Sequence, residues 1–182
     1  GEAIASYFEE SRPDVVLTME VKGIPLALMT ARAFDAPLVV VRRGAQVTDA
    51  PAVSVNYASG SSRVVQTMTL ERRAVQPGAK VLFVDDFLRG GGTARGVHDL
   101  MREFRAEIIG VAVLVAAASP RQKMVDRFIS LIEYGGVTEL EGSYPFTFDR
   151  SSRAYRLNRY LHGIIQPELR GRFLYDREGS YD

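Results

Sequence analysis

Residues 81–95 combine an apolar run, two acids and three glycines in an order that few folds accommodate. Val81–Val84 is typical of a strand buried on both faces of a sheet. Asp85 and Asp86 follow it, and Gly90–Gly92 lead into a segment of helical spacing that begins at Thr93. Parallel α/β sheets bind their ligands at such strand-to-helix turns, beyond the carboxyl ends of the strands. The sequence therefore predicts a parallel sheet with a ligand site at this turn.

Apolar runs and helical segments alternate along much of the chain. The predicted strands are Val15–Thr18, Pro37–Val41, Lys80–Val84 and Ile108–Ala118, and the predicted helices are Gly1–Ser11, Pro25–Phe34, Thr93–Phe104 and Gln122–Tyr134. Because the strands are almost continuously apolar, we expect an α/β fold with a central, mostly parallel sheet flanked by helices. Residues 46–63 are polar with alternating apolar positions, which predicts a hairpin or a flexible flap.

The C-terminal segment differs in composition from the rest of the chain. Arg150–Asp182 holds seven arginines and four acids, and its pattern predicts a helix at Ser152–Ile165 and a strand at Arg172–Asp176. We therefore divide the chain into a ligand-binding domain, residues 1–145, and a C-terminal extension, residues 146–182. A hood over a bound base, a dimer contact and a nucleic-acid-binding tail are the alternatives for the extension.

Charge and residue types exclude several classes of protein. The 23 Lys and Arg residues nearly balance the 22 Asp and Glu residues, which argues against nucleic-acid binding by the whole domain. The chain has no cysteine, which excludes disulfides, thiolate metal sites and a cysteine nucleophile. No apolar run is long enough to cross a bilayer and no signal peptide is visible, so we expect a cytoplasmic protein without a membrane partner.

The acids and glycines of residues 85–93 are suited to a sugar phosphate. Adjacent carboxylates can accept hydrogen bonds from the vicinal hydroxyls of a ribose, while glycine N–H groups at a helix N-terminus bind an anion. Arg89 adds a positive charge to the same turn. Glycines alone would fit any tight turn, and the two acids alone could cap a helix or bind a metal. Their combination favours a ribose 5-phosphate group.

Two common nucleotide-binding motifs are excluded. In a dinucleotide-binding fingerprint the acid follows the glycines by about twenty residues, whereas Asp85 and Asp86 precede them. A phosphate-binding Walker A loop would need Gly-Lys followed by Ser or Thr, which this turn lacks.

Phe83–Ala94 resembles the signature with which type I phosphoribosyltransferases bind 5-phosphoribosyl-1-pyrophosphate (PRPP). The resemblance implies the fold of that family, with Asp85 and Asp86 bound to the ribose hydroxyls. It also implies that the 5′-phosphate is wrapped by Arg89, Gly90, Gly91, Gly92 and Thr93. His98, within the following helix, is expected to be structural.

A second segment, Thr18–Ala27, resembles the pyrophosphate loop of the same family. By this resemblance the backbone amides of Val21, Lys22 and Gly23 meet the diphosphate, and the Lys22 ammonium supplies charge. Without it, Lys22 would be read as a solvated loop lysine. Arg43 is a further candidate for a cation near the diphosphate, as are Arg42, Arg63 and Arg72. Mg²⁺ would arrive with PRPP and have no direct protein ligand.

The segments Ser54–Ser62 and Gln66–Leu70 are similar to one subgroup, the PRPP-binding effector domains of purine-operon repressors from Gram-positive bacteria. The flap residues of this similarity are Tyr57, Ser59, Gly60 and Ser61. It implies a homodimeric regulator that senses PRPP and contacts DNA only through a winged-helix domain, which this chain does not contain. The alternative is an active purine phosphoribosyltransferase, which would also bind a purine base or nucleotide; Glu20 of the pyrophosphate loop favours it. No catalytic residue is assigned.

Overall fold

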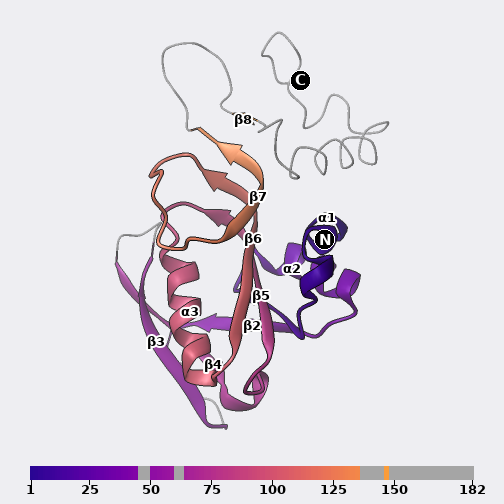
Figure 1. Ribbon diagram of the computed structural model, residues 1–182. Helices are drawn as coiled ribbons and strands as arrows, with labels where there is room; N and C mark the ends of the chain where they lie inside the picture. The colour runs from indigo at the N-terminus through magenta and orange to yellow at the C-terminus, as the bar shows by residue number, and fades with distance from the viewer. Residues whose placement is uncertain (45–49, 60–63, 136–145, 148–182) are drawn as a thin grey trace.

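The computed structural model describes residues 1–44, 50–59, 64–135 and 146–147 (Figure 1). The α-helices are α1 (Glu2–Tyr7), α2 (Ile24–Phe34) and α3 (Gly92–Phe104), with short 3₁₀ helices η1 (Glu9–Ser11) and η2 (Arg72–Ala74). The strands are β1 (Val15–Met19), β2 (Leu38–Arg43), β3 (Ala52–Ala58), β4 (Val65–Glu71), β5 (Lys80–Leu88), β6 (Glu107–Ala117), β7 (Phe128–Tyr134) and β8 (Phe146–Thr147).

The eight strands found among the described residues form one sheet, in the order β3-β4-β2-β1-β5-β6-β7-β8. The central strands β2, β1, β5, β6 and β7 are parallel. The hairpin β3–β4 joins β2 in the antiparallel sense, and β8 is antiparallel to β7. The prediction of an α/β fold with a central, mostly parallel sheet is therefore confirmed. The hairpin expected within residues 46–63 is formed by β3 and β4, and β4 lies beyond the predicted range.

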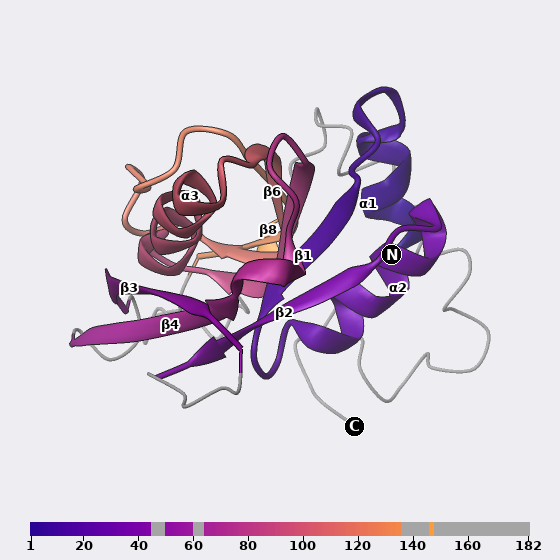
Figure 2. The ribbon, with the colours of Figure 1, turned by 90° about the horizontal axis from the view of Figure 1, so that it is seen from below.

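Helices cover both faces of the sheet. Helices α1 and α2 lie on one face and α3 lies on the other, as the view from below shows (Figure 2). Side chains of β5 alternate between two buried clusters: Phe83 joins the cluster on the α3 side, while Leu82 and Val84 join that on the α1 and α2 side. Each face of the same strand is thus covered by apolar side chains, which is why its sequence is continuously apolar.

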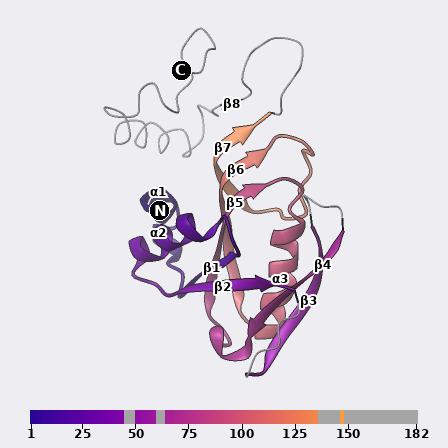
Figure 3. The ribbon, with the colours of Figure 1, turned by 180° about the vertical axis from the view of Figure 1, so that it is seen from behind.

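The β3–β4 hairpin packs against α3 (Figure 3). At Gly96 of α3 an added Cβ would lie 2.5 Å from Tyr57 Cβ and 2.7 Å from Met68 Cε. Only glycine permits this approach of helix and hairpin without a shift. The hairpin around Tyr57 and Met68 is therefore held close to the helix that follows the glycine turn.

One predicted helix is wrong. Gln122–Tyr134 was expected to be helical, but residues 118–127 contain no helix or strand and Phe128–Tyr134 forms β7. Seven residues rich in isoleucine and aromatic side chains pair with β6 from Val111↔Phe128 to Ala117↔Tyr134. Apolar residues spaced three and four apart fit a helix as well, so the parallel ladder with β6 decides the structure.

The other predicted elements agree with the structure to within a few residues, apart from β5. This strand runs on to Leu88, so that Asp85 and Asp86 lie within it. The predicted helix Ser152–Ile165 and strand Arg172–Asp176 lie outside the described residues. Among the helices that are described, none combines the length and apolar character needed to span a bilayer.

Candidate functional site

The site is formed where β5 and β6 extend past the end of β1. Strands β1 and β5 pair as far as Leu17↔Phe83, whereas the β5–β6 ladder continues to Leu88↔Ala116. The chain leaves β1 through Glu20–Gly23 and enters α2. Asp85 and Asp86 therefore lie on a stretch of β5 whose β1 side is occupied by this loop. The two segments that the sequence linked to one ligand are brought together here.

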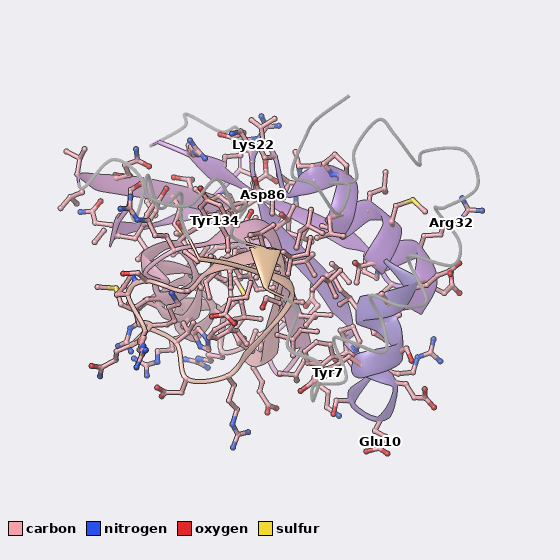
Figure 4. All side chains as sticks on the ribbon, turned by 90° about the horizontal axis from the view of Figure 1, so that it is seen from above. Tyr7, Glu10, Lys22, Arg32, Asp86 and Tyr134 are labelled. Carbon is pink, nitrogen blue, oxygen red and sulfur yellow. The ribbon has the colours of Figure 1, made fainter. Side chains whose placement is uncertain are left out.

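An open cavity of about 540 Å³ occupies this end of the sheet. Its lining includes nearly every predicted site residue that the structure describes: Val21, Lys22, Arg43, Tyr57, Ser59, Asp85, Asp86, Arg89, Gly90, Gly91, Gly92 and Thr93. Lys22 and Asp86 lie near each other in the view from above (Figure 4) and line the same cavity. Gly23 packs against Asp85 instead, and Gly60 and Ser61 lie outside the described residues.

The loop Glu20–Gly23, which resembles the pyrophosphate loop of the family, packs against Asp85 through Gly23. An added Cβ at this position would lie 2.5 Å from Thr18 Oγ1, 2.7 Å from Asp85 Oδ1 and 3.1 Å from Asp85 Cα. Any larger residue would have to push the loop away from β5, because one of these neighbours is backbone. The absence of a side chain at residue 23 therefore sets how closely the loop and the acids approach.

Glu20 anchors the other end of this loop. Its carboxylate Oε1 accepts a hydrogen bond from the backbone N–H of Arg43 at 2.6 Å, and its own N–H donates to the carbonyl of Val41 at 3.0 Å. Both contacts are to β2. The Glu20 side chain, which in the sequence favoured an enzyme, therefore holds the loop to the sheet. The sequence around Glu20 could not reveal this role, because the contact is to a distant strand.

The glycine turn presents the N-terminus of α3 to the cavity. Gly91 has φ +84°, a left-handed conformation that suits glycine, and precedes the first helical residue, Gly92. The N-cap residue, Gly91, has no side chain with which to cap the helix, so the first N–H groups of α3 are available to an anion. Thr93 is the second residue of the helix and lines the cavity with the glycines. This is the geometry of a phosphate-binding helix terminus.

Tyr57 forms part of the cavity wall on the hairpin side. Its hydroxyl donates to Oε1 of Gln66, the residue directly opposite on β4, at 2.8 Å. Burial raises the pKa of Tyr57, and the nearby Arg43 charge opposes that rise. Gln66 also lines the cavity, although the sequence did not single it out as a site residue. The cross-strand register of the hairpin is the signal that would have identified it.

Asp85 lies in a partly buried position at the end of β5. The pKa of the Asp85 carboxyl is raised to about 7, chiefly by burial and also by the nearby Asp86 side chain. The Asp86 N–H, which donates to Asp85 Oδ1 at 2.9 Å, and the Arg43 charge favour the ionised form and limit the rise. Near neutral pH this carboxyl can therefore exchange a proton. A ligand that donates hydroxyl hydrogen bonds would favour its ionised form.

We expect Asp85→Asn to stabilise the ligand-free protein at pH 8. Between the usual pKa of 3.8 and the raised value of about 7, the unfolded chain has lost the Asp85 proton while the folded chain keeps it. The free energy of unfolding therefore falls as pH rises through this window and levels off above it. Urea unfolding should show a gain for the variant of about 2 kcal/mol at pH 8 and a smaller gain at pH 5. A variant less stable than the parent at pH 8 would contradict this.

The fold and the cavity define a phosphoribosyltransferase-type domain, and the comparisons agree. Residues 1–139 match the phosphoribosyl transferase domain, so the chain belongs to that family. The chain has the type I fold: it superposes on adenine phosphoribosyltransferase from Thermoanaerobacter pseudethanolicus with a TM-score of 0.66. The match covers 73% of this chain and 77% of that one, at 24% identity.

The relatives with higher sequence identity to this chain include a transcriptional regulator and an enzyme. The chain is 39% identical over 163 residues to the purine biosynthesis transcriptional repressor PurR of Bacillus subtilis, covering 90% of this chain and 57% of the repressor. It is 31% identical over 144 residues to xanthine phosphoribosyltransferase of an Exiguobacterium species, covering 78% of this chain and 75% of the enzyme. The chain thus spans little more than half the length of the regulator and three quarters of the enzyme. The predicted resemblance to both groups is confirmed.

Proposed function

We propose that this chain is the PRPP-binding effector domain of a purine-biosynthesis transcriptional regulator, and that it senses PRPP without transferring the ribosyl group. The observation that carries the proposal is the single cavity shared by an acidic pair, a helix N-terminus and a loop with a lysine. These three groups match the ribose hydroxyls, the 5′-phosphate and the diphosphate of one PRPP molecule.

In the proposed complex, Asp85 and Asp86 accept hydrogen bonds from the ribose hydroxyls. The turn Arg89–Thr93 and the N-terminus of α3 surround the 5′-phosphate. The amides of Val21–Gly23, with the charges of Lys22 and Arg43, meet the diphosphate. Mg²⁺ would neutralise the diphosphate and be held mainly by it, as is usual where Mg²⁺ binds together with substrate phosphates.

The higher identity to the repressor supports a sensor over an enzyme, at 39% against 31%. The engagement of Glu20 with β2 weakens the one residue pattern that favoured an enzyme. Under the sensor proposal the domain is part of a homodimer, DNA is contacted by a winged-helix domain outside this chain, and the flap residues Tyr57, Ser59, Gly60 and Ser61 lie near the ligand. The alternative remains a purine phosphoribosyltransferase, supported by the relation to the xanthine enzyme.

A pyrophosphate-release assay separates the two proposals. The chain is incubated with PRPP, Mg²⁺ and, in turn, adenine, guanine, hypoxanthine and xanthine. We expect no more pyrophosphate than the Asp85→Asn, Asp86→Asn variant releases, with a xanthine phosphoribosyltransferase as positive control. Base-dependent release of pyrophosphate by the parent chain alone would establish the transferase in place of the sensor.

A further inference from the structure

The connection between β6 and β7 lies against the glycine turn. It runs past the N-terminal end of α3 (Figures 1 and 3). The N–H of Met124 donates to the carbonyl of Gly90 at 2.9 Å, and a Cβ at Gly91 would lie 3.1 Å from Met124 N. Val125 is buried in the cluster on the α3 side. Residues 118–127 thus support the turn from outside the cavity.

Lys123 holds this connection in its non-helical shape. Its ammonium donates to the carbonyl of Ala117 at 2.5 Å and to that of Pro120 at 2.6 Å. In a continuous α-helix the Pro120 carbonyl would accept from the N–H of Met124, four residues later. Here the lysine satisfies that carbonyl, and the Met124 N–H is directed to Gly90 instead.

We propose that Lys123 is a positioning residue for the phosphate-binding turn: by occupying the Ala117 and Pro120 carbonyls it allows Met124 to fix Gly90. The inference rests on the proposed function, because it assumes that Gly90–Thr93 bind the 5′-phosphate. Lys123 does not line the cavity. Its effect reaches the ligand only through the backbone of Met124 and Gly90.

The structural part of this proposal is tested without ligand, by amide hydrogen exchange followed by NMR. In Lys123→Met, which keeps the length of the side chain and removes its donors, the Met124 amide should exchange at least about 10-fold faster than in the parent, as expected for loss of a bond worth about 1.4 kcal/mol. Arg121→Met, an exposed cation of the same connection, is the matched control and should leave Met124 unchanged. The Leu17 amide in β1 should be unaffected in both variants, which excludes global destabilisation.

The functional part is tested by calorimetry with two fragments of the proposed ligand. Lys123→Met should bind ribose 5-phosphate about 10-fold more weakly and inorganic pyrophosphate as tightly as the parent, because only the turn is disturbed. A purely structural role would weaken both. Unchanged Met124 exchange, or equal loss for both fragments, overturns the positioning role of Lys123. If the parent binds neither fragment, the proposed function fails while the exchange result still decides whether Lys123 fixes the turn.

Discussion

Replacement of both Asp85 and Asp86 by asparagine is expected to weaken PRPP binding at least about 100-fold, since a hydrogen bond to a charged group contributes about 1.5–3 kcal/mol and at least two are lost. Asparagine keeps the size of each side chain but removes the negative charge that attracts the ribose hydroxyls. Equilibrium dialysis with labelled PRPP and Mg²⁺ measures the loss directly. Because Asp85→Asn should stabilise the ligand-free fold, weaker binding would not reflect unfolding.

Asp99→Asn is the matched control for this experiment. Asp99 lies on α3, near Arg95 and Arg102 at 3.5 Å each, and does not line the cavity. The same chemical change at Asp99 should leave the affinity for PRPP unchanged, because exposed ion pairs contribute little. If the double variant at residues 85 and 86 bound PRPP as tightly as Asp99→Asn, the acidic pair would not be the ribose site.

The second large effect is expected for Gly23→Ala. The added methyl group would meet Thr18 Oγ1 at 2.5 Å and Asp85 Cα at 3.1 Å, so the loop must move away from β5. Overpacking of this kind costs about 1–3 kcal/mol of stability. The displaced amides of Val21–Gly23 should also bind the diphosphate more weakly, by about 10-fold or more if one charge-assisted hydrogen bond is lost. Urea unfolding and equilibrium dialysis measure the two effects.

Gly90→Ala provides the comparison for the stability measurement. A Cβ at Gly90 has no neighbour within 4 Å, so the substitution should change the free energy of unfolding by less than about 0.5 kcal/mol or increase it. A Gly23→Ala variant that unfolds at the same urea concentration as Gly90→Ala and keeps full affinity would show that the loop does not approach Asp85 as described.

The local parts of the site could be predicted from the sequence. Asp85, Asp86 and the glycines of residues 90–92 are close along the chain, and a buried strand followed by a helix fixes where they lie in a parallel sheet. The position of the loop Glu20–Gly23 between a strand and a helix could be predicted in the same way, whereas its proposed contact with the diphosphate came from the family resemblance. In both cases the residues that matter are near neighbours in sequence, and the surrounding elements have clear apolar patterns.

Contacts between distant segments could not be predicted in this way. The bond from Arg43 N–H to Glu20, the approach of Gly96 to Tyr57 and the support of Gly90 by Met124 each join residues from different elements. Phe128–Tyr134 became a strand because β6 offered a free edge, which a local pattern cannot express. These contacts determine how closely the parts of the site approach, and therefore whether one ligand can span them.

Calorimetric titration of the chain with PRPP and Mg²⁺, in the absence of any base, is the most direct test of the central claim. The proposed function predicts saturable binding at one site per chain, with the PRPP recovered intact from the complex. The titration reaches about 1 mM PRPP, a concentration at which even weak binding of about −4 kcal/mol would be detected. If the folded protein shows no saturable heat up to that concentration, the proposed function is contradicted.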